Sequence, residues 1–189
     1  GTSGKEYRAD AVLVATGGVS YPTTGSTGDG YRLARQAGHT LVEPVPSLVS
    51  LVSHDPDCKK MMGLALKNVT LTLFEDGKDI FEEQGEMLFT HFGISGPTVL
   101  SASAHMKKGQ QYAVSLDLKP ALDEGKLDQR ILRDLEMYCN RSMENALTDL
   151  LPRSMIPVIL RRCAIAPDLQ ANSLSKQQRR ALLEQLKYF

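Results

Sequence analysis

Two glycine-rich segments near the start of the chain have the residue types that hold nucleotide-like ligands. The first, Ala15–Gly18, reads ATGG and follows a run of apolar residues, and the second, Thr23–Gly30, reads TTGSTGDG and precedes a helical pattern. Glycine lets the backbone turn sharply and approach a ligand closely, and N–H groups at a helix start can bind an anion. Both segments are therefore candidates for one ligand site.

Each glycine segment also has a purely structural interpretation. A Gly-Gly pair is common in tight turns, and Asp29 could simply cap the helix that follows. Neither G-x-G-x-x-G nor G-x-x-x-x-G-K-[ST] occurs in the sequence. The chain thus carries at most half of the usual dinucleotide-binding machinery.

A third segment, Gly85–His105, reads GEMLFTHFGISGPTVLSASAH and predicts a sharp strand-to-helix turn. Ser95 does not have the Gly-x-Ser-x-Gly spacing of a hydrolase nucleophile. His91 is a proton-transfer candidate only if it faces a cleft, and a hydrogen-bonded structural role is the favoured interpretation. Ser95 and the N–H groups near Gly96 could instead bind an anion or the edge of a cofactor.

The first forty residues predict a piece of an α/β sheet. Ala11–Ala15 is a continuous apolar run, typical of a strand that is buried on both faces of a parallel sheet. Asp29–Ala37 has helical spacing and ends at Gly38. No β-α-β neighbour for this strand precedes it in the sequence.

The middle of the chain predicts antiparallel strands. Val69, Leu71 and Leu73 alternate with threonines, which indicates one buried and one exposed face. Asp76-Gly77 predicts a hairpin turn. Further strands are expected at Lys78–Glu82, Glu86–Thr90 and Gln111–Leu118, and together they suggest a small barrel or curled sheet.

After Pro120 the pattern becomes helical. Apolar residues recur at helical spacing from Leu127 to Tyr138, and short helices are expected at Asn145–Leu151 and from Pro157 to Cys163. A last helix should begin with a capping box, and its inner face should hold four residues. The box is Ser175 with Gln178, and the face is Ala181, Leu182, Leu186 and Phe189.

Composition limits the function classes. The chain has 22 basic and 22 acidic residues, and no apolar run approaches the length of a membrane helix, so neither a membrane nor a nucleic-acid partner is expected. Its three cysteines form no C-x-x-C pair, so no metal or redox pair is expected and a reducing cytoplasm fits best.

Four stretches resemble one bacterial family of FAD-dependent flavoproteins, which includes aminoacetone-oxidase-like and bile-acid-reductase-like NAD(P)/FAD oxidoreductases. They run in the family's order through residues 9–120 and read ADAVLVATGGVSYPTTGSTGDGYRLARQAGH, VPSLVSLV, GEMLFTHFGISGP and SLDLKP. The resemblance implies an FAD domain that is interrupted by an inserted barrel and helical bundle. It also implies that Ala15, Thr16, Gly17 and Gly18 contact the cofactor, and that Gly25, Gly28 and Asp29 do so in the second loop.

The expected fold class is therefore α+β: a barrel-like β unit plus a helical bundle, preceded by a fragment of an α/β FAD-binding domain. The expected domains are residues 1–40 (FAD domain), 41–120 (β-rich insert) and 121–189 (helical insert). The chain looks like an internal fragment, which would pair with the remainder of the flavoprotein and a small-molecule substrate. FAD is expected in the full-length protein and not on this chain alone.

Two other functions stay open. The chain could be a binding or structural module without catalysis, because no residue can be assigned a catalytic role from its sequence. It could also bind nucleic acid through the helical part, since residues 126–189 carry more basic than acidic side chains. This third interpretation is the least favoured, because Arg161-Arg162 and Arg179-Arg180 lack nearby stacking aromatics.

Overall fold

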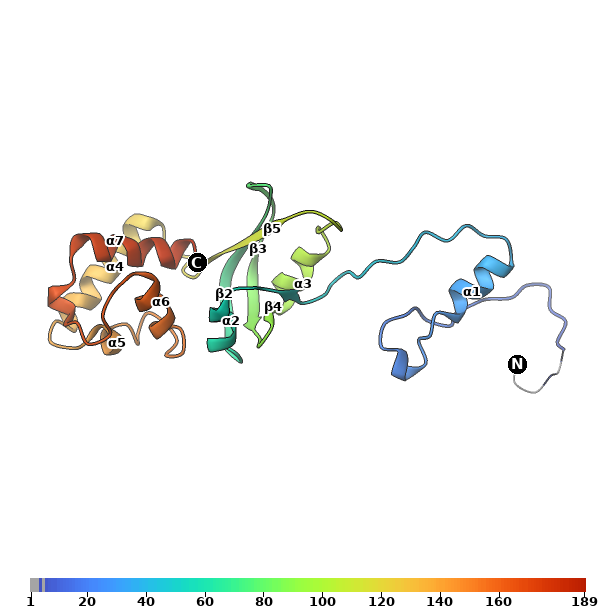
Figure 1. The fold of residues 1–189 in the computed structure, drawn as a ribbon, viewed down its shortest axis with the longest axis horizontal. Helices are drawn as coiled ribbons and strands as arrows, with labels where there is room; N and C mark the ends of the chain where they lie inside the picture. The colour runs from blue at the N-terminus through green and yellow to red at the C-terminus, as the bar shows by residue number, and fades with distance from the viewer. Residues whose placement is uncertain (1–3, 5) are drawn as a thin grey trace. The chain divides into compact units, whose positions relative to one another are not determined.

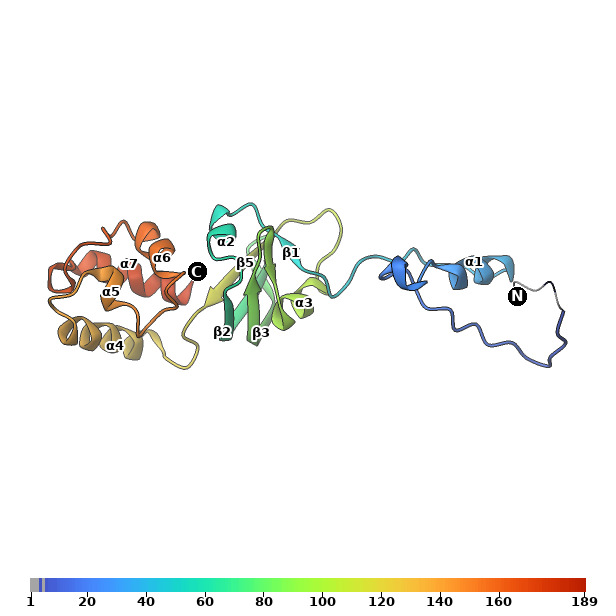
Figure 2. The same cartoon turned by 90° about the horizontal axis from the view of Figure 1, so that it is seen from below.

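The computed structural model describes residue 4 and residues 6–189, and the chain divides into two compact units, Gly1–Val45 and Pro46–Phe189. Figures 1 and 2 show the short helix α1 (Asp29–Gln36) in the first unit, and a curled sheet with several helices in the second. The expected α+β class, with a barrel-like sheet and a helical part, is confirmed. The finer division near residue 120 stays a prediction.

The first unit contains one short 3₁₀ turn, η1 (Pro22–Thr24), and one helix, α1 (Asp29–Gln36). The helix confirms the expectation from the sequence. The prediction of a strand at Ala11–Ala15 is wrong for this structure. That segment has no strand pairing, and Val12 and Leu13 are 83% and 91% exposed. An extended segment becomes a strand only where a neighbour pairs with its N–H and C=O groups, and no described residue does so here.

The second unit is built on an antiparallel sheet with the strand order β1-β4-β3-β2-β5. The strands curl into a half-barrel whose two outer edges are β1 and β5 (Figure 2). Their bounds are Leu51–Val52 (β1), Ala65–Glu75 (β2), Lys78–Phe89 (β3), Gly93–Ser95 (β4) and Tyr112–Asp117 (β5).

The longest strands follow the sequence pattern closely. Val69, Leu71 and Leu73 of β2 are buried in the core, as their alternation predicts. The turn to β3 confirms the Asp76-Gly77 hairpin, with φ of 51° and 80° at the two residues.

One strand prediction is wrong. The two strands expected at Lys78–Glu82 and Glu86–Thr90 form the single strand β3, in which Gly85 pairs with Val69. A Cβ added at Gly85 would lie only 2.8 Å from the Thr98 methyl of helix α3 (Pro97–Ser103), so the glycine serves close helix–sheet packing.

Seven further elements complete the second unit: α2 (Pro56–Lys60), α3 (Pro97–Ser103), α4 (Glu124–Met137), α5 (Met143–Ala146), α6 (Ile156–Arg162), η2 (Ala171–Ser173) and α7 (Lys176–Lys187). The capping box of Ser175 with Gln178 is confirmed at the start of α7. The helix expected at Asn145–Leu151 is shorter and earlier than predicted, because residues 147–150 continue as turns before Pro152.

The helical part closes back onto the sheet at the end of α7. Phe189 and Leu116 exchange two backbone hydrogen bonds, at 3.0 and 3.1 Å, and Leu118 N–H donates to the Leu186 carbonyl at 2.9 Å. Leu127 and Ile131 of α4 and Leu182 and Leu186 of α7 are buried in one core with the strands. Within the described part of the chain, no helix is long and apolar enough to cross a bilayer.

The segment LFTHFGISGP forms the turn from β3 to β4 and the start of α3. Thr90 N–H donates to the Gly93 carbonyl at 2.8 Å, and Gly93 N–H donates to Thr90 Oγ1 at 3.0 Å. Strand β1 lies so close to Gly93 that an added Cβ would be 2.2 Å from the Leu51 carbonyl oxygen. This motif therefore has a structural role: it lets β1 pair with β4.

We predict that Gly93→Ala destabilises the protein by about 2–3 kcal/mol, because main-chain atoms of β1 cannot yield to the new methyl group. Gly125→Ala is the matched control, since Gly125 lies in α4 and its added Cβ would have only an ordinary contact at 3.5 Å. The control should be neutral or slightly stabilising. Urea unfolding of both variants measures the difference, and equal stabilities would contradict the tight β1–β4 approach.

Candidate functional site

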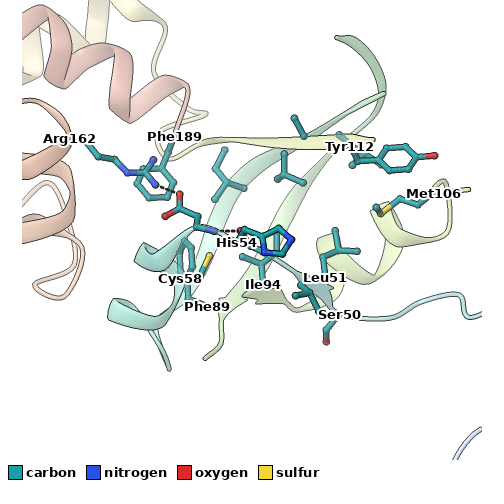
Figure 3. Close-up of a pocket in the computed structure, with 17 residues that line it drawn as sticks. Ser50, Leu51, His54, Cys58, Phe89, Ile94, Met106, Tyr112, Arg162 and Phe189 are labelled. Atoms are coloured by element: carbon teal, nitrogen blue, oxygen red, sulfur yellow. Dashed lines mark hydrogen bonds and ion pairs between the residues drawn. The ribbon is translucent and has the colours of Figure 1, made fainter. Parts of the chain in front are cut away.

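The open side of the half-barrel is a cavity of about 500 Å³. All five strands contribute apolar side chains to it, among them Leu51, Leu73, Phe89, Ile94 and Val114. Figure 3 shows Arg162 and Phe189 at one end of the cavity, and Met106 and Tyr112 at the other. A mostly apolar cavity with a few polar groups is the common form of a small-molecule site.

The polar end of the cavity is organised by Arg162. Its guanidinium lies 4.1 Å from the centre of the Phe189 ring, donates to Asp57 Oδ2 at 2.9 Å and also pairs with Asp55. Stacking on an aromatic ring and a paired carboxylate hold an arginine in one orientation. Arg162 is therefore a fixed cation at the rim rather than a mobile one.

Asp57 is a buried carboxylate at the junction of α2 and α6. It accepts hydrogen bonds from Arg161 at 2.6 Å, from Lys60 at 3.1 Å and from Arg162, and its side chain is 3% exposed. Burial by itself would raise the pKa of Asp57, but the hydrogen bonds from these three cations outweigh it and lower the pKa. Asp57 is therefore ionised at neutral pH, with a structural role.

The thiol beside this cluster is not an activated nucleophile. Cys58 lines the cavity and is buried, and burial raises the pKa of its thiol. Cys163, which follows the last residue of α6, is buried as well, and desolvation raises the pKa of its thiol to about 11. A thiol reacts as its thiolate, so neither group is suited to covalent catalysis near neutral pH.

Within the described part of the chain, the serines near the cavity form no hydrogen bond with a basic side chain. Ser95 shares a 2.7 Å hydrogen bond with Ser50, hydroxyl to hydroxyl. A serine nucleophile needs a hydrogen-bonded base, usually histidine. The arrangement agrees with the spacing argument against a hydrolase.

His91 and Phe92 form the exposed tip of the β3–β4 turn. Their rings meet edge-to-face at 4.9 Å, and neither residue lines the cavity. His91 does not face the cavity, so it does not meet the condition for a proton-transfer group there. His54, which the sequence did not single out, lies at the cavity instead (Figure 3).

In the first unit, the structure brings the two glycine segments together. Gly28 N–H donates to the Gly18 carbonyl at 3.1 Å, and a Cβ at Gly30 would lie 2.6 Å from Thr16 Oγ1. The loop Thr16–Gly18 therefore sits directly on the first turn of α1. Gly25 lies apart from this contact, in the turn that ends η1.

The joined loops have features that fit a phosphate-bearing cofactor. Gly17 and Gly28 have φ of 75° and 78°, which glycine adopts without strain. Helix α1 has glycine at its N-cap and no side-chain cap, so its first N–H groups are not covered by a capping side chain. Asp29, the first residue of α1, is paired with Arg32 at 3.1 Å, which offsets its negative charge at this helix end. Contact of Ala15, Thr16, Gly17, Gly18, Gly25, Gly28 and Asp29 with FAD stays a prediction.

Comparison with known proteins identifies the family to which this architecture belongs. A family model described as the HI0933-like protein barrel and H2TH domain matches residues 45–189. The chain belongs to this HI0933-like family. The match begins at the boundary between the two structural units and covers the whole half-barrel and helical part.

Three curated relatives extend the similarity into the first unit. A 3-dehydro-bile acid delta(4,6)-reductase from Clostridium scindens is 31% identical over 180 residues, covering 93% of this chain and 44% of the relative. Ribosomal RNA dihydrouridine synthases from Escherichia coli and Haemophilus influenzae are each 29% identical, covering 97% and 88% of this chain and 44% and 40% of the relatives. The chain spans less than half the length of these relatives. The similarity of the sequence to a bile-acid reductase is confirmed over 93% of this chain. The similarity to aminoacetone oxidases stays a prediction.

We predict that Asp57→Asn lowers the free energy of unfolding at pH 7 by about 2–3 kcal/mol, because it leaves clustered cations without a counter-charge. Since the folded pKa of Asp57 is below 3.8, its contribution is complete at pH 5 and above, and is lost as the pH falls through that lowered value. The variant should therefore show a shallower loss of stability in acid. Asp55→Asn, which keeps the α2 N-cap, is the control and should cost less than about 1 kcal/mol. Equal effects of the two variants would contradict this account.

We also predict that Cys139 reacts first with a thiol reagent at pH 8 in the folded protein, because it is the one described cysteine that is not buried. Cys163, whose pKa is raised to about 11, should react only on unfolding. Mass spectrometry after brief labelling locates the modified residues. Fast labelling of Cys163 would show that its surroundings open in the native state.

Proposed function

We propose that this chain is part of an FAD-dependent oxidoreductase. In this proposal residues 1–40 supply one edge of the FAD site, and the half-barrel and helical part form an insert that covers the flavin and shapes access for a small substrate. The joined glycine loops on the uncapped start of α1 carry the proposal, because that arrangement suits a pyrophosphate. When bound, FAD supplies hydride transfer.

The chain's own residues have defined tasks in this proposal. The N–H groups at the start of α1 bind phosphate oxygens, Thr16 adds a hydroxyl, and Gly17 and Gly18 let the backbone reach the ligand. The apolar side chains Val12 and Leu13, which are exposed here, would be covered by neighbouring strands of an FAD domain.

The names of the relatives suggest a reaction class. A delta(4,6)-reductase removes ring double bonds of a 3-oxo steroid acid, and a dihydrouridine synthase yields a uracil ring that has lost one double bond. Both reactions reduce a carbon–carbon double bond that is conjugated with a carbonyl group. We propose the same class for the protein that contains this chain, with a small conjugated carbonyl compound as first candidate and uridine in RNA as the second.

The RNA candidate has support from the names of two relatives and none from Arg161, Arg162 and Arg179 of the helical part. Arg161 and Arg162 are paired with Asp57, and Arg179 is paired with Asp128 at 3.3 Å. Paired arginines are poor phosphate contacts, because binding would first break an existing ion pair. The alternative of a non-catalytic binding or structural module would be favoured if the full-length protein binds no flavin.

We predict that Gly18→Val in the full-length protein lowers the FAD content at least about tenfold, because a branched side chain would meet the ligand. The substitution is compatible with the fold: φ at Gly18 is not in the left-handed region, and the nearest atom to an added Cβ is the Tyr31 hydroxyl at 3.3 Å. Absorbance near ~450 nm, the usual region for this cofactor class, measures occupancy. Gly125→Ala is the control and should keep full FAD.

Activity separates the remaining alternatives. The full-length protein with reduced nicotinamide is assayed on a steroid enone and on a ribosomal RNA transcript, with loss of the enone absorbance and formation of dihydrouridine as readouts. Turnover of either one assigns the substrate class. A colourless wild-type protein without turnover would overturn the oxidoreductase proposal, and unchanged FAD in Gly18→Val would overturn the contact at that turn.

A further inference from the structure

A half-buried lysine, Lys119, lies in the segment SLDLKP between β5 and α4. Its backbone is fixed on both sides: Lys119 N–H donates to Asp117 Oδ1 at 2.8 Å, and its carbonyl accepts from Leu122 N–H at 3.0 Å. The lysine lines neither the cavity of the half-barrel nor the joined glycine loops. The proposed oxidoreductase function therefore assigns it no task.

The ammonium group of Lys119 has no counter-charge of its own. The nearby carboxylate, Asp134, already accepts two hydrogen bonds from Arg130, at 2.7 and 2.9 Å, and lies 3.6 Å from Arg133. Among the described residues, no ion pair or side-chain hydrogen bond involves the Lys119 ammonium. Burial and the charge of Arg130 lower the pKa of Lys119, although Asp134 acts in the opposite direction. An anion beside this lysine would relieve both effects.

Lys119 lines a second cavity, of about 190 Å³, between β2 and the helical part. Strand β2 has a bulge at this place, because its register with β3 shifts by one residue between Leu66 and Val69. The two residues in the bulge, Lys67 and Asn68, also line the cavity. Bulges re-aim side chains and are frequent beside functional sites.

The polar groups of this cavity are hydrogen-bond donors. Asn68 accepts a hydrogen bond from Gln84 Nε2 at 2.7 Å through its side-chain oxygen, so its amide nitrogen is left to donate. Lys67 is exposed and has no ion pair with any described residue. No described residue that lines the cavity is acidic. Two ammonium groups and one amide nitrogen suit the oxygens of a phosphate, because lysine binds phosphate as a point charge.

We propose that this second cavity binds a phosphate group, with Lys119 and Lys67 as charged contacts and the Asn68 amide as a third donor. The phosphate belongs either to a small phosphorylated molecule or to the backbone of an RNA strand, since both present the same oxygens. The proposal does not depend on FAD binding or on the reaction.

The test is a titration of the full chain with inorganic phosphate, with the lysine side chains followed by NMR and the ionic strength held constant with sodium chloride. The signals of Lys119 and Lys67 should shift saturably with a Kd of about 1 mM or lower. The pKa of Lys119 should rise toward its ordinary value, because the anion favours the charged amine. Lys119→Met and Lys67→Met should each weaken binding at least about tenfold.

Lys108→Met is the matched control, because Lys108 is an exposed lysine that does not line this cavity. It should bind phosphate like the unchanged chain. Lys67 is exposed, so its variant keeps the test decisive if Lys119→Met fails to fold.

Two further titrations separate the sources of the phosphate. Tighter binding of glycerol 3-phosphate than of inorganic phosphate, at the same lysines, supports a small phosphorylated molecule. Tighter binding of a short RNA oligonucleotide, with a salt dependence that falls by about one ion in Lys119→Met, supports an RNA strand.

The absence of a saturable shift at Lys119 would overturn the proposal. Shifts of equal size at Lys108 would do the same, because they would show only general attraction between lysines and the anion. Undiminished phosphate binding in both Lys119→Met and Lys67→Met would place the anion elsewhere on the chain.

Discussion

The buried carboxylate of Asp57 connects the two parts of the second unit. It lies on α2, just after β1, and its partners Arg161 and Arg162 lie at the end of α6. A buried charge is tolerated only with close counter-charges, so α6 cannot move away from α2 without exposing or stranding it. This carboxylate therefore holds α6 against α2, in addition to the hydrogen bonds between Phe189 and Leu116 and the common core.

The same cluster determines the shape of the cavity. Arg162, held by Asp57 and Asp55, supports the ring of Phe189, and Phe189 in turn hydrogen-bonds to Leu116 of β5. The end of the helical part is thereby held at the outer edge of the sheet. An ion pair at the helix junction thus positions two of the residues that line the cavity, Arg162 and Phe189.

Local patterns predicted most of the second unit. The alternation around Val69–Leu73 and the capping box at Ser175 each depend on a few neighbouring residues, and both appear as expected. The gap expected between the strands at Lys78–Glu82 and Glu86–Thr90 is absent, because Gly85 pairs with Val69 there and packs against Thr98, a contact that only the folded sheet creates. Asp57 was missed for the same reason: its partners lie more than a hundred positions later in the sequence.

The glycine loops show a different limit of sequence reasoning. Their residue types indicated a ligand site, and the structure brings Thr16–Gly18 onto the start of α1, but the exposed Val12 and Leu13 show that the strand leading into them has no sheet around it here. β5 presents the complementary situation, a paired strand with one edge open. An unpaired strand and an unpaired edge have the same physical requirement, which is a neighbouring strand for their backbone groups. In the proposed full-length protein, neighbouring strands of the FAD domain meet that requirement around residues 11–15.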